Sequence, residues 1–114
     1  MKKLYVVTCL LFTSLISFSQ DPESYPVANC TESFCVSLDA TQPIQTYYKI
    51  DIAPFEFENY EAAQAKFGYI TNNLLTYTVD FENQRVILQV HNERTPEPKD
   101  IVWWNNYLDS LCGL

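Results

Sequence analysis

The stretch from 74 to 90, LLTYTVDFENQRVILQV, constrains the fold of this chain more than any other. Apolar and polar residues alternate on each side of the polar segment 82–84. Successive side chains of a strand point to opposite faces of a sheet, so this alternation is typical of strands with one buried face. Two such runs around a short polar turn predict a β-hairpin over 74–81 and 85–91. The rest of the chain must then supply a cover for the apolar face.

The first 19 residues have the features of a secretory signal peptide of bacterial style. Lys2 and Lys3 are followed by an apolar run over 4–16 that is too short to span a bilayer. Ser17 and Ser19 then occupy the small-residue positions of a cleavage site. We therefore expect an exported protein, periplasmic or extracellular, that has no membrane anchor after cleavage.

About 95 residues remain after cleavage, which is enough for one domain with one modest core. All 14 Asp and Glu residues lie in this part, whereas two of the seven Lys and Arg residues lie in the signal segment, which leaves a net charge of −9. Nucleic acids and anionic membranes recruit patches of Lys and Arg. The acidic balance therefore predicts no nucleic-acid partner.

The remaining chain is expected to consist of an irregular tail over 20–33 and a single α+β domain over 34–114. Alternating residues predict a short strand over 34–38 and a longer one over 46–53. Pro54 ends the longer strand, because proline cannot donate a hydrogen bond to a β-ladder.

Two segments have the periodicity of amphipathic helices. The first begins after the N-cap candidate Asn59 and the second after Asp100, and Gly113 is suited to end the second. Packing these helices on the sheet predicts a core made of Tyr48, Ile50, Ile52, Phe67, Leu75, Tyr77, Val79, Val86, Leu88, Val90, Ile101, Trp104, Leu108 and Leu111.

The order of these elements, strand–helix–strand–strand–helix, is that of a split βαβ unit with a further helix. Val79-Asp80 and Arg85-Val86 flank the hairpin turn, and Asp100-Ile101 opens the second helix. In these features the chain resembles ferredoxin-like domains of the heavy-metal-associated type. The resemblance implies a βαββα sandwich with an antiparallel sheet and two helices on one face.

Two features of that family have no counterpart here. The family binds metal through a C-x-x-C after the first strand, but the loop 53–59 reads APFEFEN and contains no cysteine. The family's fourth strand, which lies antiparallel beside the first, does not follow the second helix. We expect the strand 34–38 to form a hairpin with 46–53, fill that place and cover the sheet edge.

Three cysteines remain after cleavage, and export predicts one disulfide and one free thiol. The topology brings the end of the second helix near the start of the 34–38 strand, so Cys112 is expected to bridge to the N-terminal segment. If the segment is extended, Cys30 points to the same side as the inward residues Phe34 and Val36. This makes Cys30 the preferred partner. Cys35 is the alternative partner.

Three cysteines and one histidine define an alternative function. Cys30, Cys35, Cys112 and His91 suit zinc or thiol chemistry, as in a periplasmic metal-binding or redox module. Oxidation consumes the same thiols, so we expect no metal site and no cofactor. The acidic clusters lie at helix starts, where the helix dipole favours them, and nucleophile or phosphate-loop motifs are missing. The chain is therefore expected to be non-enzymatic.

Two groups of side chains are candidates for an interaction surface. Trp103 and Tyr107 lie on one flank of the second helix, either as an exposed hot spot or as peripheral core. The second face of the sheet carries polar and aromatic residues that either stand in water or form a flat binding face; they include Tyr47, Lys49, Gln89 and His91. The leading hypothesis is an exported, non-catalytic interaction or accessory domain with a protein partner.

Overall fold

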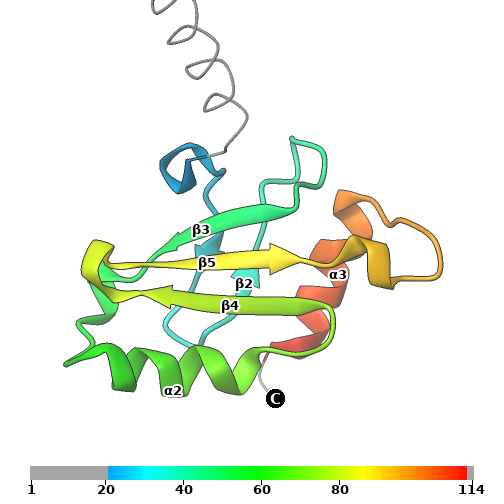
Figure 1. Ribbon diagram of the computed structural model, residues 1–114. Coiled ribbons are helices and arrows are strands. Elements are labelled where there is room, and N and C mark those ends of the chain that lie inside the picture. The colour runs from blue at the N-terminus through cyan, green and yellow to red at the C-terminus, as the bar shows by residue number, and fades with distance from the viewer. Residues whose placement is uncertain (1–20, 113–114) are drawn as a thin grey trace, which may run out of the picture.

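An antiparallel sheet of three strands forms the centre of the protein (Figure 1). It consists of β3 (Tyr47–Asp51), β5 (Arg85–Val90) and β4 (Leu75–Asp80), in that spatial order. This computed structural model describes residues 21–112, so the predicted signal peptide and Gly113 lie outside the described residues. No helix within 21–112 has the length and hydropathy of a membrane span.

The predicted hairpin is present as β4 and β5. Tyr77 lies opposite Leu88 in the register, so the alternating apolar residues of both strands share one face of the sheet. A short 3-10 helix over Phe81–Asn83 makes the turn, and Gln84 follows it in the left-handed conformation with φ 52°. The polar break in the sequence is therefore the turn, as the alternation predicts.

The strand β3 pairs with the other side of β5, with Tyr48 opposite Leu88. Since β5 is antiparallel to both neighbours, β3 and β4 run parallel to each other on either side of it. The connection from β3 to β4 runs through α2 (Tyr60–Ile70). The chain thus crosses over one face of the sheet from β3 to β4. The next strand, β5, then lies between these two parallel strands.

Both helices begin where the sequence predicts. The Asn59 side chain accepts a hydrogen bond from the Ala62 N–H at 2.8 Å and caps α2. The Asp100 side chain accepts one from the Trp103 N–H at 2.9 Å and caps α3 (Ile101–Leu111). Each cap satisfies a donor that the first helical turn leaves open.

One apolar cluster joins the helices to the inner face of the sheet. All of the predicted core residues are buried except Ile101 and Leu111, which are half-buried at its margin. The face that carries Tyr47 and Thr78 holds no buried residue within the three strands. Both helices therefore cover the same face and leave the other open.

The N-terminal segment is more ordered than predicted. Within the expected tail, a 3-10 helix forms over Pro22–Ser24, and β1 (Asn29–Cys30) pairs antiparallel with β2 (Val36–Ser37) in a second sheet. Residues 26–28 lie parallel to β3, with the Lys49 N–H donating to the Pro26 carbonyl at 2.9 Å.

The sequence predicts that the 34–38 strand fills the place beside β3 in an antiparallel hairpin. This prediction is wrong. Residues 26–28 occupy that place instead. Proline is tolerated there because an edge position does not require its missing N–H. The chain then turns over 31–34 with Phe34 at φ 63°, which sends β2 back along β1 rather than along β3.

Candidate functional site

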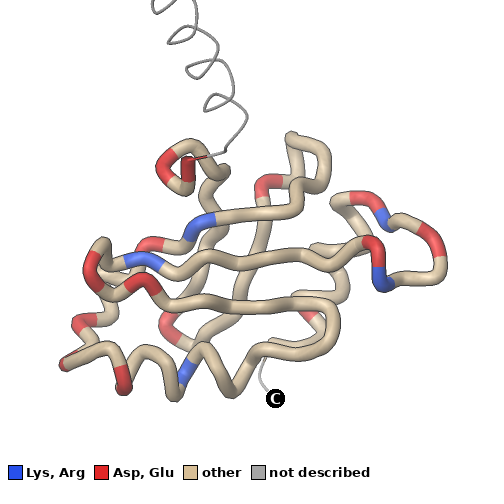
Figure 2. Tube along the Cα trace, viewed as in Figure 1, with Lys and Arg blue, Asp and Glu red and all other residues tan. Residues whose placement is uncertain are grey.

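A groove of about 260 Å³ opens between the C-terminal ends of α2 and α3 and the start of β2. Its apolar walls are formed by Phe34, Val36, Ile70, Leu108 and Leu111. None of the lining residues within 21–112 carries a charged side chain. The charged residues lie mostly in the turns and loops around the sheet and along the outer side of α2 (Figure 2).

Tyr69 stands at the rim of this groove with 81% of its surface exposed. A large aromatic side chain in water beside an apolar groove is typical of a residue that becomes buried in an interface. The apolar periodicity of the sequence does not indicate Tyr69, since this residue lies off the apolar face of α2. Its neighbour Ile70 belongs to that face and lines the groove.

Two polar residues make the end wall of the groove rigid. The Thr71 hydroxyl accepts a hydrogen bond from the Tyr77 N–H at 3.0 Å. The Asn72 side chain accepts one from the Leu75 N–H at 2.9 Å and donates one to the Tyr107 hydroxyl at 3.2 Å. These bonds tie the α2–β4 connection to the edge of β4 and to α3.

Tyr77 is the most buried of the polar residues that line the groove. The residue is 5% exposed, and within 21–112 no group hydrogen-bonds to its hydroxyl. No side-chain oxygen or nitrogen of the described residues is both fully buried and unpaired, so the Tyr77 oxygen keeps some contact with solvent. Burial raises the pKa of Tyr77, and the nearby Cys30 and Tyr107 raise this pKa further. The hydroxyl is therefore neutral.

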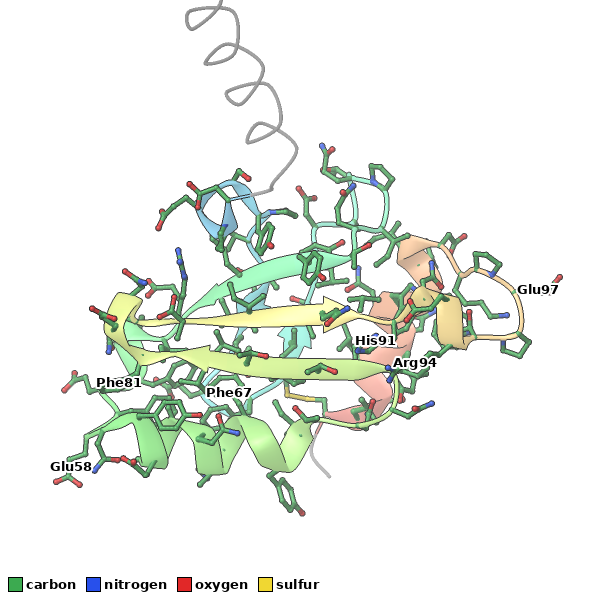
Figure 3. All side chains as sticks on the ribbon, in the orientation of Figure 1. Glu58, Phe67, Phe81, His91, Arg94 and Glu97 are labelled. Carbon is green, nitrogen blue, oxygen red and sulfur yellow. A yellow bond between two sulfur atoms is a disulfide. The ribbon has the colours of Figure 1, made fainter. Side chains whose placement is uncertain are left out.

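A disulfide joins Cys35 to Cys112, whose Cα atoms are 5.0 Å apart (Figure 3). The prediction that Cys112 bridges to the N-terminal segment is confirmed, but the preference for Cys30 as its partner is wrong. Cys30 would point to the same side as Val36 only if the chain between them were extended. The turn at Phe34 interrupts the extended chain. Cys112 lies at the groove as well as in the disulfide.

The four residues of the metal or redox alternative do not come together. Two of them form the disulfide, and no three His, Cys, Asp or Glu side chains within 21–112 are placed to hold a metal ion. Cys30 remains a free thiol, half-buried, and burial raises its pKa to about 11. Because the thiolate is the reactive form, this thiol is poorly suited to redox chemistry at neutral pH.

His91 lies at the margin of the open face of the sheet, beside Thr76 of that face. It is 5% exposed, with Nε2 2.7 Å from the Thr76 hydroxyl and Nδ1 3.2 Å from a Glu93 carboxylate oxygen. Asn92 folds the following loop back by bonding both the N–H and the carbonyl of Lys99, at 2.8 and 3.0 Å. Figure 3 shows His91 where β5 enters this loop.

The remaining candidates are half-buried. The rings of Trp103 and Tyr107 stack at 5.4 Å and pack against the core, as a peripheral layer does. On the open face of the sheet, Tyr47 stacks on Tyr25 at 5.2 Å, so the N-terminal segment already covers part of that face. Lys49 and Gln89, the other predicted residues of that face, are also half-buried.

Comparison with known protein families, curated proteins and solved structures finds no match. The groove, with its uncharged walls and its exposed rim, is the part of the described chain best suited to bind another molecule.

Proposed function

We propose that this protein is an exported, non-catalytic interaction domain that binds a partner protein through the groove between α2 and α3. The observation that carries the proposal is the pairing of an uncharged apolar groove with the exposed Tyr69 at its rim. Well-packed aromatic anchors beside pockets dominate the binding energy of protein interfaces. The open sheet face is less suitable, since Tyr25 covers part of it.

The scaffold of this domain is proposed to be ferredoxin-like. The order β3-β5-β4, the crossover through α2 and the single covered face support that arrangement. In the heavy-metal-associated type, the loop after the first strand would hold the metal. Here Phe55 and Phe57 from that loop pack on Phe34, with ring centroids 5.1 and 6.4 Å away. An aromatic cluster in that place supports the scaffold without metal transfer.

Export rests on two observations. The signal-like segment 1–19 directs the chain to the secretory route. The disulfide Cys35–Cys112 fits an oxidising compartment, where such bonds persist.

The test is a matched pair of variants on α2. Peptides are selected from a random library against the disulfide-intact protein, and their affinity is measured by calorimetry. Tyr69→Ser should weaken binding at least about 10-fold, as loss of an interface anchor does. Tyr60→Ser removes another exposed tyrosine of the same helix, away from the groove, and should leave affinity unchanged. Equal effects of the two substitutions would contradict the proposal.

A further inference from the structure

We propose that the groove selects a tyrosine side chain of the partner, whose hydroxyl hydrogen-bonds to the hydroxyl of Tyr77. This inference rests on the proposed function and adds the chemistry of the inserted residue. It follows from the size of the groove, from the lack of charge on its lining residues within 21–112 and from the buried hydroxyl of Tyr77, to which no described group hydrogen-bonds.

The size of the groove points to a single side chain. Its volume of about 260 Å³ lies below the range of roughly 300–1,000 Å³ that is usual for pockets of cofactors and drug-sized ligands. One large side chain between Ile70 and Leu108 would fill most of it. The Phe34 ring, which also packs on Phe55 and Phe67, adds aromatic surface to the wall of the groove.

The lack of charge selects a neutral occupant. A carboxylate or ammonium group would lose its hydration in the groove and meet no opposite charge among the lining residues that the structure describes. The described ion pairs lie elsewhere, as between Arg85 and Glu23. Lys, Arg, Asp and Glu side chains are therefore poor occupants.

The Tyr77 hydroxyl distinguishes among neutral occupants. A leucine or phenylalanine that filled the groove would remove water from this hydroxyl and supply no hydrogen bond in return. Sites that leave a buried polar group unpaired reject such analogues strongly. Tyrosine combines a large apolar ring with a hydroxyl at its tip that both donates and accepts.

The experiment compares two probes, N-acetyl-tyrosinamide and N-acetyl-phenylalaninamide, in NMR titrations of the disulfide-intact protein. The tyrosine probe should bind about 10-fold more tightly, as expected for one satisfied buried hydroxyl. Both probes should shift the resonances of Ile70, Leu108 and Leu111, which line the groove.

Tyr77→Phe should abolish the preference between the probes. This variant should fold normally, because no described group hydrogen-bonds to the Tyr77 hydroxyl. Tyr47→Phe, on the opposite face of the sheet, is the matched control and should keep the preference.

Four outcomes would overturn the inference. Groove shifts without discrimination, or a preference that survives Tyr77→Phe, would remove the selectivity and leave the groove as the binding site of the proposed function. Shifts at the groove that grow with protein concentration alone would identify a second copy of the chain as the occupant. No groove shifts with either probe would count against the inference and the proposed function together.

Discussion

Asn105 on α3 bonds both backbone groups of Leu38. The Leu38 N–H donates to Asn105 Oδ1 at 2.8 Å, and Asn105 Nδ2 donates to the Leu38 carbonyl at 3.1 Å. About two helical turns later, Cys112 is bonded to Cys35. The two links hold β2 against α3, and they position Val36 in the wall of the groove.

Asn105→Ala removes both hydrogen bonds to Leu38 and should destabilise the protein by about 1–3 kcal/mol, since the backbone groups at this site are partly buried. Urea denaturation measures the change in the free energy of unfolding. Asn106→Ala, at the exposed neighbouring position, should change it by less than about 0.5 kcal/mol. A similar cost for both variants would contradict the role given to Asn105.

The disulfide predicts a specific peptide map. Non-reducing digestion should yield a peptide pair joined through Cys35 and Cys112, with Cys30 recovered as a free thiol. Cys112→Ser should lower the free energy of unfolding by about 4 kcal/mol in the chain-entropy model, because the bond joins residues 77 apart. A pair joined through Cys30 and Cys112 would show that the turn at Phe34 is misplaced.

Leu88→Ala tests the inner face of the sheet. Leu88 is completely buried on the central strand β5, and its truncation should cost about 2–5 kcal/mol. Ile87→Ala, which changes the adjacent residue on the open face, should cost clearly less in the same chemical denaturation. If the two costs were equal, the assignment of the two sheet faces would be wrong.

Asp80 should contribute to acid sensitivity. Its carboxylate accepts hydrogen bonds from Asn83 Nδ2 and from Arg85 Nε, both at 2.9 Å, which lower the pKa of Asp80. A lowered folded-state pKa stabilises the protein above the unfolded-state pKa, and this stabilisation is lost as pH falls through the folded-state pKa.

Thermal midpoints between pH 7 and pH 2 should therefore fall less steeply below about pH 4 for Asp80→Asn than for the natural sequence. Asp109→Asn, at an exposed helix position, is the control and should follow the natural sequence. Parallel curves for all three proteins would rule out this contribution.

The elements predicted from local signals agree with the structure. Period-two alternation gives β4 and β5, and the N-cap residues Asn59 and Asp100 give the starts of both helices. These signals depend on residues close together in the sequence, so they are available without knowledge of the tertiary structure.

The errors have tertiary causes. The positive φ of Phe34 is not signalled by its residue type, and it reverses the parity on which the Cys30 prediction rested. The alternation along β5 does not indicate the burial of His91, whose ring nitrogens lie 2.7 Å from the Thr76 hydroxyl and 3.2 Å from a Glu93 carboxylate oxygen. The groove was not foreseen because its walls come from three separate parts of the chain.

The most direct test of the groove as the binding site is an NMR titration of the disulfide-intact protein with a peptide selected from a random library. The largest chemical-shift changes are expected on Tyr69, Ile70 and Leu108, around the groove. Changes centred on Lys49 and Gln89, on the open face of the sheet, would contradict this expectation.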